Sequence, residues 1–321
     1  MLIKKPSDIP SSEITPKSTF LSRRQFIAGA AITGAAVASG LYMRRSGWHL
    51  EETAQAGAKI AGIVKSQYST TEKPNSFKDI TNYNNYYEFS TDKYEPSQLA
   101  GNFRMRPWTV SIEGLVQKPK KLDIDAILKL APPEERIYRH RCVEGWSMVI
   151  PWVGFPLSAL IKQVEPLGKA KFVAFETVYA PDQMPNQHSS VLPWPYVEGL
   201  RMDEAMHPLT ILATGLYDEV LPSVDGGPLR LVVPWKYGYK NIKAIVKIKF
   251  VESMPPTTWS IQWPQAYPFY SNVSPIEDHA LRSQTYERRI GEFQKRPTLL
   301  LNGYADQVAG LYSGMDLHRN F

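Results

Sequence analysis

The sequence predicts a mixed α+β fold with irregular connections, and three observations support this prediction. Stretches with strand-like alternation outnumber stretches with helical period, the candidate helices are short, and long proline-rich segments separate the elements. The chain has 321 residues, and neither an internal repeat nor a break in composition divides it after its first segment. We therefore expect a leader over residues 1–56 and a single domain over residues 57–321.

The leader has the layout of a twin-arginine export signal. Arg23 and Arg24 are followed by Phe26 and by an uncharged stretch, residues 25–43, that is rich in alanine and glycine. This route exports folded proteins, often after a cofactor has been inserted, so we expect a periplasmic protein. An uncleaved membrane anchor is the alternative, although so many small residues make a weak membrane span. The cleavage point stays open.

The charge of the chain excludes one class of partner. Residues 1–56 hold seven Lys/Arg and four Asp/Glu, which leaves 30 Lys/Arg and 27 Asp/Glu of the 37 and 31 in the whole chain. No block of basic residues stands outside the leader. A nucleic-acid surface is therefore not expected.

The first half of the domain begins with a segment, residues 57–75, that we interpret as a linker because it is polar and has no clear period. Residues 107–114 alternate apolar and polar side chains and predict a half-buried strand. A short helix is expected over 124–130, with Asp123 as its N-cap and two prolines as its stop. Residues 135–141 predict a strand that ends at Cys142.

The second half continues with short elements. The pattern predicts a helix over 156–164, a buried strand over 171–179, a helical turn at 203–205, an apolar strand over 229–234 and long loops over 180–195 and 254–268. The clearest strand is expected over 242–251, where Ile242, Ala244, Val246, Ile248 and Phe250 alternate with lysines.

Cys142 is the only cysteine of the chain, which excludes an intramolecular disulfide and a CxxCH haem site. A buried apolar filler is the ordinary interpretation of a lone cysteine. However, Arg139, His140 and Arg141 precede it, and their charge would favour the thiolate. A Cys/His hydrolase is one reading, but a free thiolate is easily oxidised outside the cytoplasm. Zinc would need further ligands at spacings that the six histidines do not show. A metal that brings most of its own ligands fits better.

Several long stretches carry a resemblance to a known family. Residues 141–147, RCVEGWS, resemble the cysteine motif of molybdenum enzymes with the sulfite-oxidase fold, and the whole chain is more closely similar to the catalytic subunits of periplasmic protein-methionine-sulfoxide reductase systems. The matching stretches are TNYNNYYEF (81–89), ERIYRHRCVEGWSMVIPWVGFPL (135–157), VAFETVYAPDQMP (173–185), LRMDEAMHPLT (200–210), RLVVPWKYGYKNIK (230–243) and RPTLLLNGYA (296–305). The resemblance implies a sulfite-oxidase-type molybdopterin-binding fold.

The resemblance also implies a site. Cys142 would bind molybdenum, and the cofactor molybdopterin would be held by residues that match the family's binding positions: Asn84, Tyr87, Glu88, Thr177, Asp225, Arg230, Asn241, Ile242 and Lys243. Arg230 suits the phosphate of the pterin, because guanidinium binds phosphate bidentately. Without the resemblance, Asn84 would be interpreted as part of a turn, Thr177 as a strand former and Lys243 as a solvated strand residue.

Two positions leave questions open. Asp225 stands where the family pattern has asparagine, and an ionised carboxylate accepts hydrogen bonds but cannot donate them. Glu144 lies two residues after Cys142 and is either a proton relay near the metal or a surface carboxylate, depending on whether the chain there is a strand or a turn. Trp146 is expected to form a wall of the site.

The implied function is reduction of methionine sulfoxide in periplasmic proteins. The electrons would come from a membrane subunit that contains haem, because no haem or iron–sulfur motif is present here. We expect a monomeric catalytic subunit within a heterodimer. One alternative is a sulfite oxidase of the same fold, to which Arg139 and Arg141 would offer a cationic site. The other is a periplasmic binding protein without enzymatic activity.

Overall fold

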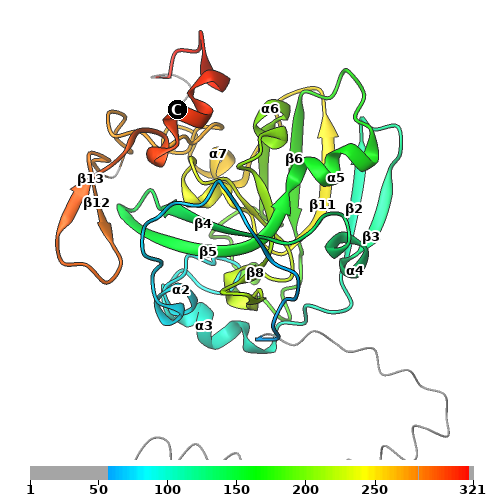
Figure 1. The fold of residues 1–321 in the computed structure, drawn as a ribbon, viewed down its shortest axis with the longest axis horizontal. Helices are drawn as coiled ribbons and strands as arrows, with labels where there is room; N and C mark the ends of the chain where they lie inside the picture. The colour runs from blue at the N-terminus through cyan, green and yellow to red at the C-terminus, as the bar shows by residue number, and fades with distance from the viewer. Residues whose placement is uncertain (1–56, 281, 318–321) are drawn as a thin grey trace, which may run out of the picture. The chain divides into compact units, whose positions relative to one another are not determined.

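The computed structural model describes residues 57–280 and 282–317, so the predictions about the leader lie outside the described residues. The strands of the described part form two sheets, joined by short helices and long loops (Figure 1). This arrangement confirms the α+β prediction. Within these residues, no helix has the length and the apolar character that a membrane crossing needs.

The first sheet is built around β5 (Trp146–Pro156). This strand pairs antiparallel with β4 (Glu134–Arg141) and β8 (Ile211–Leu216), and parallel with β12 (Tyr286–Arg289). The remaining strands of this sheet are β1 (Val64–Lys65) beside β4, β9 (Glu219–Val220) and β10 (Arg230–Val232) beside β8, and β13 (Lys295–Pro297) beside β12.

The second sheet has the order β3 (Lys120–Asp123), β2 (Thr109–Gly114), β11 (Ile245–Val251), β6 (Phe172–Thr177) and β7 (Val197–Arg201). Strand β2 confirms the predicted alternation, because Val110 and Ile112 are buried while Thr109 is exposed. β6 buries every second residue, so it is covered mainly on one face rather than on both as we expected.

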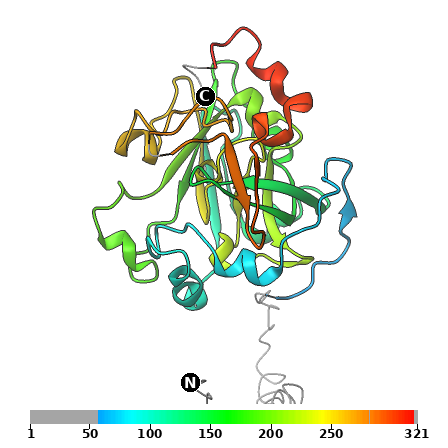
Figure 2. The same cartoon turned by 90° about the vertical axis from the view of Figure 1, so that its left-hand side faces the viewer.

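The helices are short, as predicted. They are α2 (Phe77–Asn82), α3 (Glu95–Leu99), α4 (Ile124–Leu128), α5 (Leu157–Val164), α6 (Met202–Met206), α7 (Thr258–Gln262) and α8 (Ala305–Val308). The side chain of Asp123 accepts a hydrogen bond from the Ala126 N–H, which confirms the predicted N-cap of α4. Both views place α2 and α3 at the end of the domain opposite the C-terminal segment (Figures 1 and 2).

Three segments differ from the sequence-based expectation. β5, the central strand, was missed, because its residues from Trp146 to Phe155 are all buried and show no alternation, and because Pro151 interrupts the run. Residues 57–75 are not a free linker, since β1 pairs with β4 and Asn75 is buried. β11 begins at Ile245 rather than at residue 242, because Ala244 has a φ of 47°.

The register of β11 corrects the predicted alternation. Its pairing with β6 shifts between Ile245 and Lys247, so Ile245 is buried while Val246 is only half-buried. The residues before the strand are thereby released from the sheet. Asn241, Ile242 and Lys243 turn toward a cavity between the elements.

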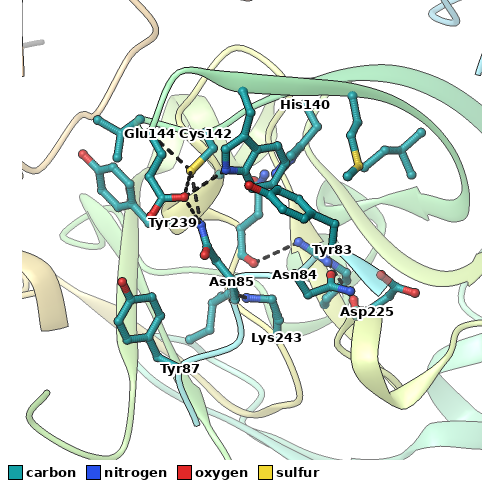
Figure 3. A pocket seen from close by; sticks show the side chains of 18 of the residues that line it. Tyr83, Asn84, Asn85, Tyr87, His140, Cys142, Glu144, Asp225, Tyr239 and Lys243 are labelled. Atoms are coloured by element: carbon teal, nitrogen blue, oxygen red, sulfur yellow. Dashed lines mark hydrogen bonds between the residues drawn. The ribbon is translucent and has the colours of Figure 1, made fainter. Parts of the chain in front are cut away.

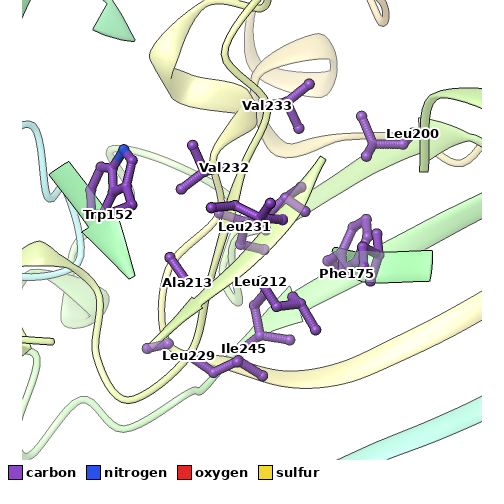
Figure 4. Packing of buried hydrophobic residues seen from close by; sticks show 14 of the residues in the cluster. Trp152, Phe175, Leu200, Leu212, Ala213, Leu229, Leu231, Val232, Val233 and Ile245 are labelled. Carbon is purple, nitrogen blue, oxygen red and sulfur yellow. The ribbon is translucent and has the colours of Figure 1, made fainter. Parts of the chain in front are cut away.

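The hydrophobic core joins the two sheets. Figure 4 shows Leu212 and Leu231, from the first sheet, packed near Phe175 and Ile245 from the second. All four side chains are essentially inaccessible to solvent. This packing fixes the position of the strand ends that carry the candidate site.

Candidate functional site

A cavity of about 930 Å³, including the part open to solvent, lies among the α2–α3 segment, the β4–β5 turn and the chain that enters β11. Ten of the eleven predicted site residues line it: Asn84, Tyr87, Glu88, Cys142, Glu144, Asp225, Arg230, Asn241, Ile242 and Lys243. Figure 3 shows several of them converging on one space from separate parts of the chain. The structure therefore brings together segments that are up to 159 positions apart, from Asn84 to Lys243.

Thr177 is the predicted residue that lies behind the wall of the cavity. It is fully buried at the end of β6. Its hydroxyl donates to the carbonyl oxygen of Lys243 at 2.7 Å, and its N–H donates to the carbonyl oxygen of Tyr196 at 2.9 Å. Thr177 thus holds the backbone of a lining residue.

Cys142 lies where β4 turns into β5. The turn is closed by two backbone hydrogen bonds of 3.0 Å, from Cys142 to the Trp146 carbonyl and from Gly145 to the Cys142 carbonyl. Gly145 has a φ of 88°, a conformation that favours glycine. The side chain of Cys142 consequently faces the cavity from a rigid corner, and the residue is only 7% exposed.

The prediction that the three preceding basic residues favour the thiolate is wrong. Strand alternation turns two of their side chains, those of Arg139 and Arg141, away from the cavity. Arg139 binds the carboxylate of Glu72, and Arg141 binds that of Glu287 at 3.0 Å. His140 does line the cavity, but it is uncharged. Burial first, and then the nearby guanidinium and ammonium groups at the deep end, lower its pKa to about 3.

On balance, the surroundings of Cys142 disfavour the thiolate. Burial and the neighbouring carboxylate of Glu144 raise the pKa of the thiol to about 12, although the Glu144 N–H, Lys93 and Arg141 oppose the rise. A metal would have to displace the thiol proton to bind the sulfur. Among the described residues, no three His, Cys, Asp or Glu side chains lie close enough together to hold a metal, so a metal here would need ligands from a cofactor.

Glu144 lies in the turn, yet its carboxylate returns to the sulfur, with Oε2 3.8 Å from Cys142 Sγ. It accepts hydrogen bonds from Trp146 Nε1 at 2.9 Å, Asn85 Nδ2 at 3.1 Å and Lys93 Nζ at 2.8 Å. Burial pushes its pKa upward, but these three donors outweigh burial and hold the pKa below its ordinary value. Glu144 is thus an ionised group held in place, not a free surface carboxylate.

Two cations, the buried Arg230 and the half-buried Lys243, mark the deep end of the cavity. Arg230 is 4% exposed, donates to the carbonyl oxygens of Asp225 at 2.6 Å and Asn241 at 3.2 Å, and lies over the ring of Trp152. Lys243 donates to the carbonyl oxygen of Asn85 at 2.9 Å. Burial lowers the pKa of Arg230 to about 10 and that of Lys243 to about 8. Cations held by carbonyl oxygens retain the capacity to bind an anionic ligand.

Asp225 provides a test of whether a cofactor fits this end. It is 2% exposed, and its Oδ2 has no hydrogen-bond partner among the described residues. Within the same residues, no ion pair joins its carboxyl group to Arg230 or Lys243. An orphaned polar atom beside two cations that are largely withdrawn from solvent fits a polar ligand that carries phosphate.

The pKa of Asp225 also answers the question raised by its sequence. Burial raises it to about 7, although Arg230 and Lys243 oppose the rise. A carboxyl group that keeps its proton can donate one hydrogen bond and accept another, as an asparagine amide does. Asp225 can therefore replace the expected asparagine without placing a full negative charge beside a phosphate.

Several residues that line the cavity or contact its lining were not predicted. Asn85 is adjacent to the predicted residue Asn84, so the sequence around it did indicate the site, but nothing in the sequence pointed to Lys93.

The mouth of the cavity is aromatic. Tyr87 meets Trp259 edge-on at 5.2 Å, and Trp259 stacks on Tyr267 at 4.4 Å between ring centroids. Two of these rings come from a segment, residues 254–268, that was expected only as a loop. Trp146 lines the cavity as predicted.

Comparisons with known proteins agree with this geometry. Residues 98–259 match the family profile described as the oxidoreductase molybdopterin binding domain. The chain is 54% identical to the protein-methionine-sulfoxide reductase catalytic subunit MsrP of Burkholderia mallei and 52% identical to that of Ralstonia nicotianae, each over the full length of both chains. Among solved structures, the sulfane dehydrogenase SoxCD from Paracoccus pantotrophus matches 48% of this chain and 40% of its own at 21% identity, with a TM-score of 0.40. On its full-length identity to these relatives, the chain belongs to the family of protein-methionine-sulfoxide reductase catalytic subunits, which are oxidoreductases that bind molybdopterin.

Proposed function

We propose that this protein reduces methionine sulfoxide residues of periplasmic proteins and so repairs them, with Cys142 as the one protein ligand of molybdenum. The observation that carries the proposal is the pairing of a single sulfur at one wall of the cavity with two cations, the buried Arg230 and the half-buried Lys243, at its deep end. Arg230 and Lys243 would hold the phosphate of molybdopterin, and Asp225 would pair with a polar atom of the cofactor. Asn84, Tyr87, Glu88, Asn241 and Ile242 would complete the binding surface, and Thr177 would support it from behind.

The bound cofactor would supply the exchange of an oxygen atom and of two electrons at the metal. The protein's own residues then have distinct tasks. The rings of Tyr87, Trp259 and Tyr267 form an apolar mouth that suits the methyl and methylene groups of an oxidised methionine side chain. Glu144, ionised and beside the sulfur, is placed to relay protons from solvent to the sulfoxide oxygen, which needs two protons and two electrons to be released as water.

Export and the source of electrons extend the same proposal. The arginine pair at Arg23 and Arg24 supports export of the folded, cofactor-loaded protein to the periplasm. Its relatives are named as catalytic subunits, which supports a partner subunit. Because the sequence has a single cysteine and no haem motif, we propose that a membrane subunit with haem donates the electrons to a monomeric catalytic subunit with one domain over residues 57–321.

The sulfite oxidase alternative loses its main support. Sulfite is a small dianion and would be favoured by arginines beside the metal, but Arg139 and Arg141 are both committed to carboxylates outside the cavity. The wall near Cys142 is instead aromatic. Family membership also excludes a binding protein without enzymatic activity.

The test of the proposal is metal analysis of the purified protein and of Cys142→Ala, combined with reduction of a methionine sulfoxide peptide by a dye donor. We expect about one molybdenum per chain and turnover in the parent, and loss of turnover in the variant. Sulfite should not be oxidised at a comparable rate. Full turnover by Cys142→Ala would contradict the assignment of the sulfur as metal ligand.

A further inference from the structure

The sulfur of Cys142 is contacted by a side chain from outside its own turn. Asn85, in the segment between α2 and α3, places Nδ2 3.3 Å from Cys142 Sγ and 3.1 Å from Glu144 Oε2 (Figure 3). Its amide therefore donates toward both groups. The two ends of the amide are not equivalent, because only the nitrogen end carries protons.

Lys93 determines which end of the Asn85 amide faces the sulfur. Its ammonium group donates to Asn85 Oδ1, and also to Glu144 Oε1 at 2.8 Å. If the amide were turned over, its oxygen would lie against the Glu144 carboxylate and against a sulfur that has lost its proton to bind the metal, while its nitrogen would face an ammonium group. Lys93 thus disfavours the reversed orientation at both ends of the amide.

Lys93 also sets the charge beside the sulfur. The ionised carboxylate of Glu144 lies 3.8 Å from Sγ, and the ammonium of Lys93 forms an ion pair with it. Both side chains are largely withdrawn from solvent, with exposed fractions of 23% and 30%, so water screens the pair only in part. Without the ammonium group, the surroundings of the sulfur would carry one more negative charge.

We infer that Lys93 is a positioning residue for the metal site, which fixes the Asn85 amide toward the sulfur of Cys142 and balances the charge of Glu144. This inference rests on the proposed function, because it requires Cys142 to be the metal ligand. Among the described residues, the hydrogen bonds and the ion pair of the Lys93 ammonium group go to Asn85 and Glu144. The Lys93 carbonyl oxygen, which accepts from the Asn84 N–H at 2.8 Å, ties the same segment to the cofactor-binding stretch.

The inference is tested by the reduction potential of the metal in the loaded protein, followed by its electron paramagnetic resonance signal. Lys93→Met removes the charge and the donors, and Lys93→Arg restores a cation. A matched control is Lys247→Met, because Lys247 forms an ion pair of similar exposure with Glu176, at 3.0 Å, away from the cavity.

We expect Lys93→Met to retain molybdenum but to show a lower reduction potential and an altered signal, since added negative charge favours the oxidised metal. Its kcat for a methionine sulfoxide peptide should fall on the order of tenfold with little change in KM, as is typical when a residue that orients a metal ligand is lost. Lys93→Arg should recover most of the potential, and Lys247→Met should match the parent.

Two results would overturn the inference. One is an unchanged potential and signal in Lys93→Met. The other is loss of molybdenum from both Lys93 variants while Lys247→Met retains it, because Lys93 would then be needed to build the site rather than to tune it. Failure of the underlying proposal is distinguishable, since retention of the parent's metal signal by Cys142→Ala would refute the sulfur ligand whatever the Lys93 variants do.

Discussion

Replacing Asp225 with asparagine should change the pH dependence of stability in the protein without cofactor. Burial raises the pKa of Asp225 from an ordinary 3.8 to about 7 in the folded chain. Between these two values the folded state binds a proton that the unfolded state has released, so the free energy of unfolding falls as the pH rises through this window. Below pH 3.8 and above about pH 7, the ionisation of Asp225 does not change the free energy of unfolding further as the pH changes.

The size of the effect follows from the same pKa values. A tenfold change in an acid constant corresponds to about 1.4 kcal/mol, so ionising the buried carboxyl costs the folded state at most about 4 kcal/mol by pH 8. Asp225→Asn has no such cost. It should therefore be more stable than the parent by up to about 4 kcal/mol at pH 8, and by little at pH 4.

Urea unfolding of both proteins at intervals from pH 4 to pH 8 measures this difference. Other titrating groups are shared by the two proteins, so they cancel when the variant is compared with the parent. A difference in unfolding free energy that does not change between pH 4 and pH 8 would refute the reasoning. It would mean that Asp225 is ionised at pH 4 in the folded chain, and that its charge is compensated by Arg230 and Lys243.

Two further predictions concern packing and a buried ion pair. Gly238→Ala should destabilise the protein by about 1–3 kcal/mol and weaken cofactor retention, because the new Cβ would lie 2.7 Å from the His140 ring; an unchanged melting temperature and molybdenum content would contradict this. In the parent protein, the Lys236 ammonium group lies 2.6 Å from the Glu204 carboxylate, and both side chains are fully buried. Lys236→Met leaves this carboxylate without its cation, so it should lower the free energy of unfolding in urea by roughly 3–5 kcal/mol. Lys247→Met, at an ion pair that is about one-third exposed, is the matched comparison and should cost about 1 kcal/mol or less.

The sequence predicted the elements whose pattern is visible locally. β2 shows a period of two because one face is buried, and α4 carries its own N-cap in Asp123. β5 left no such pattern, because neighbours on both faces bury it. The start of β11 depended on the positive φ of Ala244, which the surrounding packing imposes and no composition reveals.

The candidate site likewise has features that the sequence predicted and features that it did not. Long stretches shared with a family pointed to Cys142, Arg230 and Lys243, and the cavity confirms that these residues lie together. The effect of the charges around the sulfur did not follow from the sequence. Adjacent residues of a strand face opposite ways, so Arg139 and Arg141 leave the cavity although they flank the cysteine.

By itself, then, the sequence determined the fold class, the family and the residue that offers the sulfur, because these depend on local pattern and on extended identity. Only the tertiary structure decided which charges act at the site. Asn85 reaches the sulfur of Cys142, and Lys93 reaches Glu144, from a segment about 50 positions away. Burial by the fold raises the pKa of Asp225 to about 7, although two cations oppose the rise. Electrostatic interactions depend on distance and burial in space, and neither is written in the order of the residues.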